Sequence, residues 1–124
     1  MGLSTHVLDT MHGVPAAGMA VAFYTTQPDA PGSDALLTTL VKRFVLNADG
    51  RNPDGLLYDS ASLRPGTYRL VFDVAGYFDA RGVPLAQPSF LNRVTLDFGV
   101  ADTRQHYHVP LLVSPWSYST YRGS

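Results

Sequence analysis

Short segments of alternating apolar and polar residues, separated by turns rich in proline and glycine, most constrain the fold of this chain. The last nineteen residues, HYHVPLLVSPWSYSTYRGS, show this pattern most clearly. Successive side chains of a β-strand point to opposite faces, so alternate residues share a face. In residues 106–113 one face is wholly apolar and consists of Tyr107, Val109, Leu111 and Val113. A Ser114-Pro115 break and a second alternating segment follow, which predicts a hairpin of two strands.

The rest of the chain has the same character. Further strands are expected at residues 3–9, 19–26, 36–46, 67–74 and 94–98. The spacing in residues 36–46 also fits a helix, but the β-branched and aromatic residues there, and the prolines and glycines on both sides, favour a strand. Residues 76–82 could form one or two helical turns. Seven or eight short strands with almost no helix predict an all-β sandwich.

Composition bounds what such a sandwich can do. The 124 residues are expected to form one domain, residues 1–124. Charged residues make up 15% of the chain, against about 25% in an average soluble domain. A small protein with so little charge has more surface to hide than usual, and self-association is the simplest way to hide it.

Charge and cysteine content exclude several classes of partner. Nine Lys and Arg residues oppose ten Asp and Glu residues, so nothing attracts nucleic acid or an anionic membrane. The absence of cysteine excludes disulfides and thiolate metal sites. The N-terminal residues lack a basic segment followed by an apolar one, and no span is long enough to cross a bilayer. A cytoplasmic location is therefore expected, and a peroxisomal or periplasmic one stays open.

Two imidazoles stand out on strand faces that are not the obvious core. His6 shares a face with Leu8, and His108 shares one with Pro110 and Leu112. Each histidine could simply be a surface or interface residue. His106 and His108, two residues apart on one strand face, could also chelate a metal. Arg51 follows an Asp-Gly turn, where an arginine is more often solvated than catalytic. No nucleophile signature, phosphate-binding loop or dinucleotide fingerprint is present.

Several blocks of the sequence resemble the 5-hydroxyisourate hydrolases, the transthyretin-related enzymes of urate breakdown. The blocks are His6-Val7-Leu8-Asp9, Asp49-Gly50-Arg51, Gly66-Thr67-Tyr68-Arg69-Leu70-Val71-Phe72, His106-Tyr107-His108-Val109-Pro110-Leu111-Leu112 and the terminal Tyr121-Arg122-Gly123-Ser124. The terminal tetrapeptide is the most specific of these, because a change there separates the hydrolases from the hormone-carrying transthyretins. The similarity covers essentially the whole chain.

The resemblance implies a transthyretin-like sandwich of two four-stranded sheets with one short helix. It also implies a homotetramer, a dimer of dimers, with active sites in the channel where the dimers meet. The reaction implied is hydrolysis of 5-hydroxyisourate to 2-oxo-4-hydroxy-4-carboxy-5-ureidoimidazoline, without metal or cofactor. By position in the family's motifs, the catalytic residues would be His6, Arg51, His108 and Ser124. The substrate contacts would be His6, Arg51, Ser119, Tyr121, Arg122 and Gly123.

These residue types suit the opening of a cyclic amide. Histidine can both accept and donate a proton near neutral pH, and arginine can hold a urea-like edge and a developing oxyanion. The alternatives are a non-catalytic carrier that uses the same channel for a hydrophobic ligand, and a structural sandwich in which both histidines are replaceable. Since Pro110 has no backbone N–H, a bulge or a locally unpaired stretch is expected beside His108.

Overall fold

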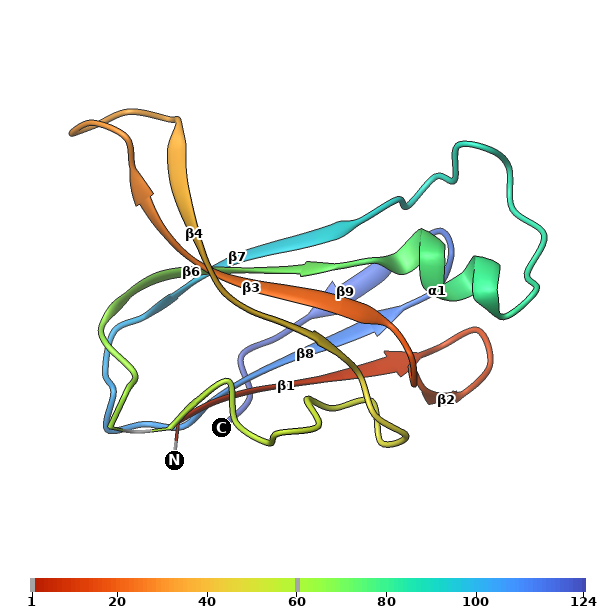
Figure 1. Cartoon of the computed structure of the whole chain (residues 1–124), viewed down its shortest axis with the longest axis horizontal. Coiled ribbons are helices and arrows are strands. Elements are labelled where there is room, and N and C mark those ends of the chain that lie inside the picture. Colours follow the sequence, from red (N-terminus) through yellow and green to blue (C-terminus); the bar gives the residue numbers. More distant parts are fainter. Residues whose placement is uncertain (1, 60) are drawn as a thin grey trace.

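The protein is a sandwich of two β-sheets packed face to face (Figure 1). The structure is a computed structural model that describes residues 2–59 and 61–124. The first sheet runs β2-β1-β8-β9, and the short β5 also pairs with β1. Its strands are β1 (Gly2–Asp9), β2 (Val14–Pro15), β5 (Tyr58–Asp59), β8 (Tyr107–Val113) and β9 (Tyr118–Thr120). The second sheet runs β4-β3-β6-β7. Its strands are β3 (Ala20–Pro28), β4 (Leu36–Val45), β6 (Gly66–Phe72) and β7 (Val94–Val100).

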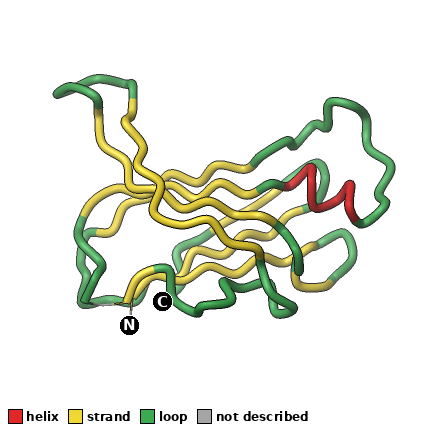
Figure 2. Tube along the Cα trace, in the orientation of Figure 1, coloured by secondary structure: helices red, strands yellow, loops and turns green. Residues whose placement is uncertain are grey.

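The expected all-β sandwich is confirmed, with two small additions. The first sheet contains five strands rather than the four that the resemblance implies, and two of them, β2 and β5, are only two residues long. Neither is long enough to show an alternating pattern in the sequence. The strand expected at residues 36–46 is present and ends at Val45, and the tip of the β3–β4 hairpin projects away from the sandwich (Figures 1 and 2).

The one helix of the described residues, α1 (Val74–Ala80), begins two residues before the expected turns. Asp73 follows β6 and caps the helix, because its Oδ1 accepts a hydrogen bond from the backbone N–H of Gly76 at 3.1 Å. No helix in residues 2–59 and 61–124 has the length and hydropathy needed to span a membrane.

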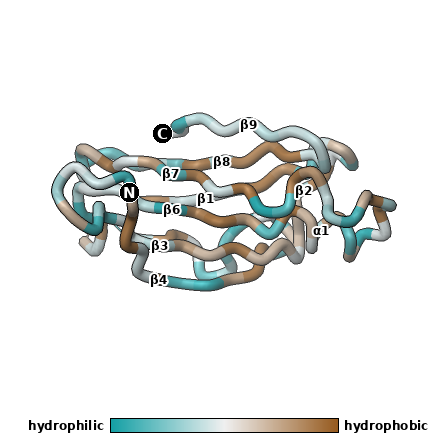
Figure 3. The backbone as a smooth tube through the Cα atoms, turned by 90° about the horizontal axis from the view of Figure 1, so that it is seen from above, coloured by the Kyte–Doolittle hydropathy of each residue, from teal (hydrophilic) through white to brown (hydrophobic). Residues whose placement is uncertain are grey.

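The core lies between the two sheets, where apolar residues of both meet. Figure 3 shows apolar residues recurring along strands of both sheets, among them β8 and β3. Leu3 and Val7 of β1 and Leu111 of β8 are fully buried, and they belong to the same cluster as Phe23 and Phe72 of the second sheet. The core face predicted for residues 106–113 is thus confirmed. On the opposite face of β8, His108 and Leu112 are only partly buried.

β1 and β8 come from opposite ends of the chain and are paired in parallel. The pairing runs without a break from Leu3↔Tyr107 to Asp9↔Val113. In this register Ser4 lies beside His108 and His6 lies beside Pro110. The parallel pairing therefore brings both imidazoles of interest to one face of the first sheet.

Candidate active site

The imidazoles of His6 and His108 lie together on the outer face of the first sheet. Their ring centroids are 6.4 Å apart and the ring planes differ by 28°, a stacked arrangement. Both side chains are partly buried. Two groups that can each accept or release a proton are thus held within reach of one small molecule.

Arg51 reaches this pair through a tight turn, residues 47–51. The side-chain Oδ1 of Asn47 accepts hydrogen bonds from the backbone N–H groups of Asp49 and Arg51, at 2.9 and 3.1 Å. The carbonyl of Gly50 accepts one from the N–H of Val7 at 3.0 Å, and Arg51 forms an antiparallel bridge with His6. The turn is therefore attached directly to β1.

Gly50 is needed at this attachment for two reasons. Its φ is +72°, a backbone conformation that residues with a side chain rarely adopt. A Cβ at this position would also lie 2.5 Å from the carbonyl oxygen of Val7. The Asp-Gly turn expected from the sequence thus also carries Arg51 to the imidazoles.

The surroundings keep both imidazoles neutral. Burial lowers the pKa of His6 below 6.5 and the Arg51 guanidinium lowers it further, against an opposing effect of Asp49. The pKa of His108 is lowered by burial, then by Arg51, and then by His6 and His106. At neutral pH each ring can therefore accept a proton at one nitrogen and donate one from the other.

The C-terminal segment is tied to His108. The backbone N–H of Gly123 donates to the carbonyl of His108 at 2.7 Å, and the N–H of His108 donates to the carbonyl of Gly123 at 3.0 Å. A Cβ on Gly123 would lie 3.0 Å from the Cβ of His108 and 3.2 Å from its Cδ2. Only a glycine fits there without displacing the imidazole or the tail.

The locally unpaired stretch expected beside His108 is present. The ladder between β8 and β9 ends at the pair Leu111↔Thr120 and resumes at the bridge His108↔Gly123 in the same register, so no bulge forms. The Thr120 hydroxyl donates to the carbonyl of Pro110 at 2.7 Å across the gap. Residues 121 and 122 are left outside the ladder.

The other predicted site residues are distributed over the tail. Ser119 is exposed and pairs with Leu112, which is on the same strand face as His108. Tyr121 is 61% exposed and lines a cavity of about 370 Å³ together with Tyr107 and Arg122, apart from the imidazoles. Ser124 is exposed at the end of the chain.

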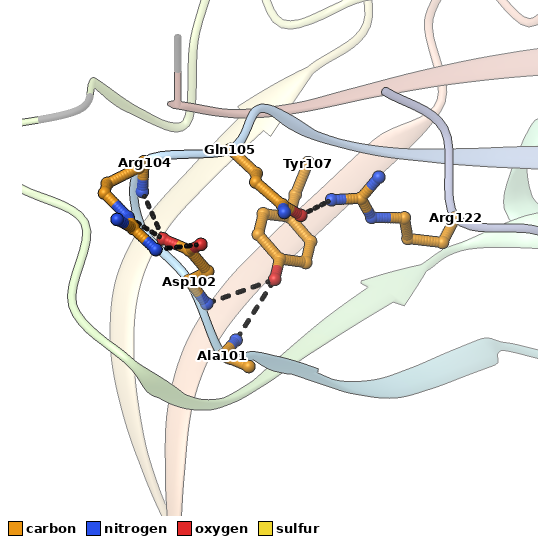
Figure 4. A network of polar contacts seen from close by, with 6 residues as sticks. All are labelled: Ala101, Asp102, Arg104, Gln105, Tyr107 and Arg122. Atoms are coloured by element: carbon orange, nitrogen blue, oxygen red, sulfur yellow. Dashed lines mark hydrogen bonds and ion pairs between the residues drawn. The ribbon is translucent and has the colours of Figure 1, made fainter.

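Arg122 is directed away from the imidazoles. Its guanidinium carbon lies 4.4 Å from the centre of the Tyr107 ring, and its Nη2 donates to the Gln105 Oε1 at 2.7 Å (Figure 4). Tyr107 is on the core-facing side of β8, opposite His108. Within this chain, Arg122 is therefore placed to hold the tail against β8 rather than to contact a molecule lying on the imidazoles.

Ser4 is a site residue that the sequence did not reveal. Its Oγ lies 2.8 Å from the Nδ1 of His108 and 3.0 Å from the Nε2 of His106. Ser4 shares the strand face of His6, but only the parallel register, which the sequence does not specify, places it beside His108. Ser4, His106 and Arg51 also line one cavity of about 440 Å³.

The same contacts bear on the metal site considered for His106 and His108. The two ring nitrogens that converge, His106 Nε2 and His108 Nδ1, are both hydrogen-bonded to the Ser4 hydroxyl. In residues 2–59 and 61–124 no group of three or more His, Asp or Glu side chains is arranged to hold a metal ion. The geometry is that of a polar network.

Comparison with known proteins gives full-length matches. The model of the HIUase/Transthyretin family matches residues 3–123. The 5-hydroxyisourate hydrolase of Deinococcus radiodurans is 51% identical over 123 residues, which cover 99% of this chain and 96% of that protein.

Solved structures agree with this match. A crystal structure of (S)-allantoin synthase has a TM-score of 0.88 and 40% identity over 99% of this chain, which spans only 43% of that longer chain. Sea bream transthyretin in complex with thyroxine has a TM-score of 0.80 and 26% identity, and the match covers 99% of this chain and 95% of that one. With sequence and structure matched along essentially its whole length, this chain belongs to the HIUase/Transthyretin family.

Proposed function

We propose that this protein is a hydrolase of urate degradation that converts 5-hydroxyisourate to 2-oxo-4-hydroxy-4-carboxy-5-ureidoimidazoline. The observation that carries the proposal is the pair of neutral imidazoles, His6 and His108, stacked at 6.4 Å beside the Arg51 turn. The 51% identity to a 5-hydroxyisourate hydrolase over nearly the whole chain supports the same substrate.

The reaction requires one proton to be taken and one to be given. Water adds to the carbonyl carbon of the cyclic amide while one imidazole accepts a proton from it. The carbon–nitrogen bond then breaks, the nitrogen receives a proton from the other imidazole, and the carbon is left as a carboxylic acid that loses its proton to water. The proton taken up by the first imidazole replaces the one given by the second. His6 and His108 share these two tasks, and each is worth about 10²–10⁴-fold in rate.

Arg51 supplies the charge that the intermediate needs. Its guanidinium is permanently cationic and presents a planar set of donors, so it holds the urea-like edge of the substrate and stabilises the oxyanion of the tetrahedral intermediate. The same charge helps to keep both imidazoles neutral at rest. The chemistry proposed requires no metal or cofactor.

The tail closes the site in this proposal. Gly123 holds the segment against His108, Ser119 contacts the substrate, and Ser124 orients the water or an imidazole through its hydroxyl or carboxylate. Tyr121 contacts the substrate only if its side chain leaves the cavity that it lines with Tyr107 and Arg122. Arg122 takes part in substrate binding only if it leaves Tyr107, so its proposed contribution here is to fix the tail.

The proposed assembly is a homotetramer, a dimer of dimers that covers the outer face of the first sheet. Two observations support it. His6 and His108 lie on a sheet face that is only partly covered within one chain. The segment that includes β9 exposes the large side chains of Trp116 and Tyr118, by 60% and 45%. Light scattering coupled to size-exclusion chromatography should give four times the mass of the chain, and a monomer would contradict the assembly.

A carrier function would suit a different surface. A site for a hydrophobic ligand has no need of two titratable rings and a guanidinium on one face, and the sequence identity to transthyretin is about half that to the hydrolase.

The test of the proposed function is to add the protein to 5-hydroxyisourate freshly made from urate and urate oxidase. We expect its ultraviolet band to decay faster than it does spontaneously; decay at the spontaneous rate would refute the proposal.

A further inference from the structure

Four residues from the two ends of the chain form one line of hydrogen bonds. The backbone N–H of Gly2 lies 3.1 Å from the Nδ1 of His106, the Nε2 of His106 lies 3.0 Å from the Ser4 Oγ, and that oxygen lies 2.8 Å from the Nδ1 of His108. The line ends at an imidazole of the proposed active site. All four residues are on β1, on β8 or immediately before β8.

The directions of the first two hydrogen bonds in this line follow from its first member. A backbone N–H can only donate, so the Nδ1 of His106 must carry a lone pair. The proton of the neutral ring is then on Nε2, which donates to the Ser4 oxygen. The single hydroxyl hydrogen of Ser4 is not used by these two bonds, so it is free to be donated to the Nδ1 of His108 at 2.8 Å.

We propose that Ser4 and His106 are positioning residues that hold His108 in the tautomer with its proton on Nε2. The inference rests on the proposed function for its consequence: His108 then meets the substrate as a proton donor, and His6 is left to accept the proton of the water. No hydrogen bond to residues 2–59 or 61–124 uses the Nε2 proton of His108, so it is available to the departing nitrogen.

The surroundings of His108 favour this arrangement. Burial and the permanent charge of Arg51 oppose a positive charge on its ring, and His6 and His106 oppose it whenever they are themselves protonated. The ring is therefore neutral at rest, and a neutral ring has one donor nitrogen and one acceptor nitrogen. Which nitrogen is which depends on the partner of Nδ1, and that partner is Ser4.

The tautomer can be measured without any substrate. In protein labelled with ¹⁵N-histidine, protonated and unprotonated ring nitrogens give well-separated chemical shifts. We expect a single Nε2–H form of His108 in the unmodified protein at neutral pH, and a mixture of both tautomers in Ser4→Ala. An Nδ1–H form in the unmodified protein would overturn the inference. Because this readout needs no turnover, it stands even if 5-hydroxyisourate proves not to be the substrate.

Turnover then tests whether the line acts through His108. Ser4→Ala should lower kcat about tenfold, the scale of one hydrogen bond, with little change in KM, and Ser4→Thr should retain the hydroxyl and the rate. In a His108→Ala background, Ser4→Ala should have no further effect. An equal loss in both backgrounds would mean that Ser4 serves only the fold. Ser33→Ala, in the loop after β3, is the matched control and should leave kcat unchanged.

Two substitutions of His106 separate its two hydrogen bonds. The glutamine side chain in His106→Gln would place an amide N–H near the position of Nε2 and can still donate to Ser4, whereas the shorter side chain in His106→Asn can accept only from Gly2. His106→Gln should therefore retain most of the rate, and His106→Asn should lose about as much as Ser4→Ala. Equal rates for the two variants, whether high or low, would contradict the role given to the hydrogen bond between His106 and Ser4.

Discussion

The backbone N–H of Gly123 donates a hydrogen bond to the carbonyl of His108 at 2.7 Å, so the end of the chain is fixed to a residue of the proposed active site. The opposite bond, from His108 to Gly123, makes this a closed two-bond bridge. A chain terminus usually frays unless it is held in this way. Here the position of the tail and the position of an imidazole depend on each other.

The first prediction concerns that dependence. Gly123→Ala should lower kcat/KM by up to about 10²-fold, because the new methyl group would meet the His108 ring and shift it by a few tenths of an ångström or more. Stability should change little. Gly99→Ala is the control, since a Cβ there meets only a carbonyl oxygen at 3.9 Å. Full activity of Gly123→Ala would show that the bridge has no role in positioning His108.

The second prediction separates the parts of the tail. Deleting residues 121–124 should reduce turnover of 5-hydroxyisourate to the spontaneous rate, because it removes the bridge to His108 and the proposed substrate contacts. Ser124→Ala removes only the side-chain hydroxyl of Ser124, so it asks whether that hydroxyl is needed. Folding of the shortened chain is checked by circular dichroism. Near-normal activity of a folded, shortened chain would refute the role of the tail.

The third prediction follows from the charge of Arg51. The pKa of His6 and that of His108 are lowered from 6.5, by burial and by Arg51, so kcat/KM should fall only as the pH drops below 6.5 and the rings become protonated. Arg51→Gln removes one cause of the lowering. Both pKa values should rise, and the acid limb of the pH profile should move to higher pH as kcat falls.

The control for this substitution is Arg43→Gln on β4, which removes a guanidinium from the other sheet. It should leave the pH profile unchanged. An acid limb at the same pH in Arg51→Gln and in the unmodified protein would show that the guanidinium does not act on the imidazoles.

The fourth prediction concerns stability away from the site. The fully buried carboxylate of Asp9 accepts hydrogen bonds from the Tyr77 hydroxyl at 2.8 Å and from the His12 Nδ1 at 2.6 Å. Burial and Asp9 raise the pKa of Tyr77 to about 12, so its hydroxyl stays a donor. Tyr77→Phe should cost about 1.5–3 kcal/mol in the free energy of unfolding by urea. Tyr24→Phe on β3 is the control and should leave the free energy of unfolding nearly unchanged. If Tyr77→Phe is as stable as the unmodified protein, the hydrogen bond from Tyr77 to Asp9 does not stabilise the fold.

How far the sequence predicts this fold depends on the length of the element. Residues 67–72 and 107–113 alternate over enough positions to specify a strand and its buried face, and residues 36–45 are a strand despite a spacing that fits a helix. The two-residue strands β2 and β5 leave no pattern, because they form only where other strands pass close by. The helix α1 begins at Val74, two residues before the expected start at Gly76, because Asp73 caps it.

The same limit applies to the site. The strand faces and the family motifs single out His6, Arg51 and His108, and the structure brings them together. Ser4 could not be found, because its role depends on the parallel pairing of segments more than a hundred residues apart. The side chain of Arg122 points away from the imidazoles because its guanidinium packs on the Tyr107 ring. The alternation of residues along a strand does not predict such a contact.

The central claim, that two imidazoles and a guanidinium on one sheet face open a cyclic amide, is tested most directly by turnover of the histidine variants. The measurement is the decay of the 5-hydroxyisourate ultraviolet band with unmodified protein, His6→Ala and His108→Ala at equal concentration. We expect each variant to be about 10²–10⁴-fold slower than the unmodified protein while the oligomer stays intact. Unchanged rates in both variants would remove the histidines from the reaction and contradict the account.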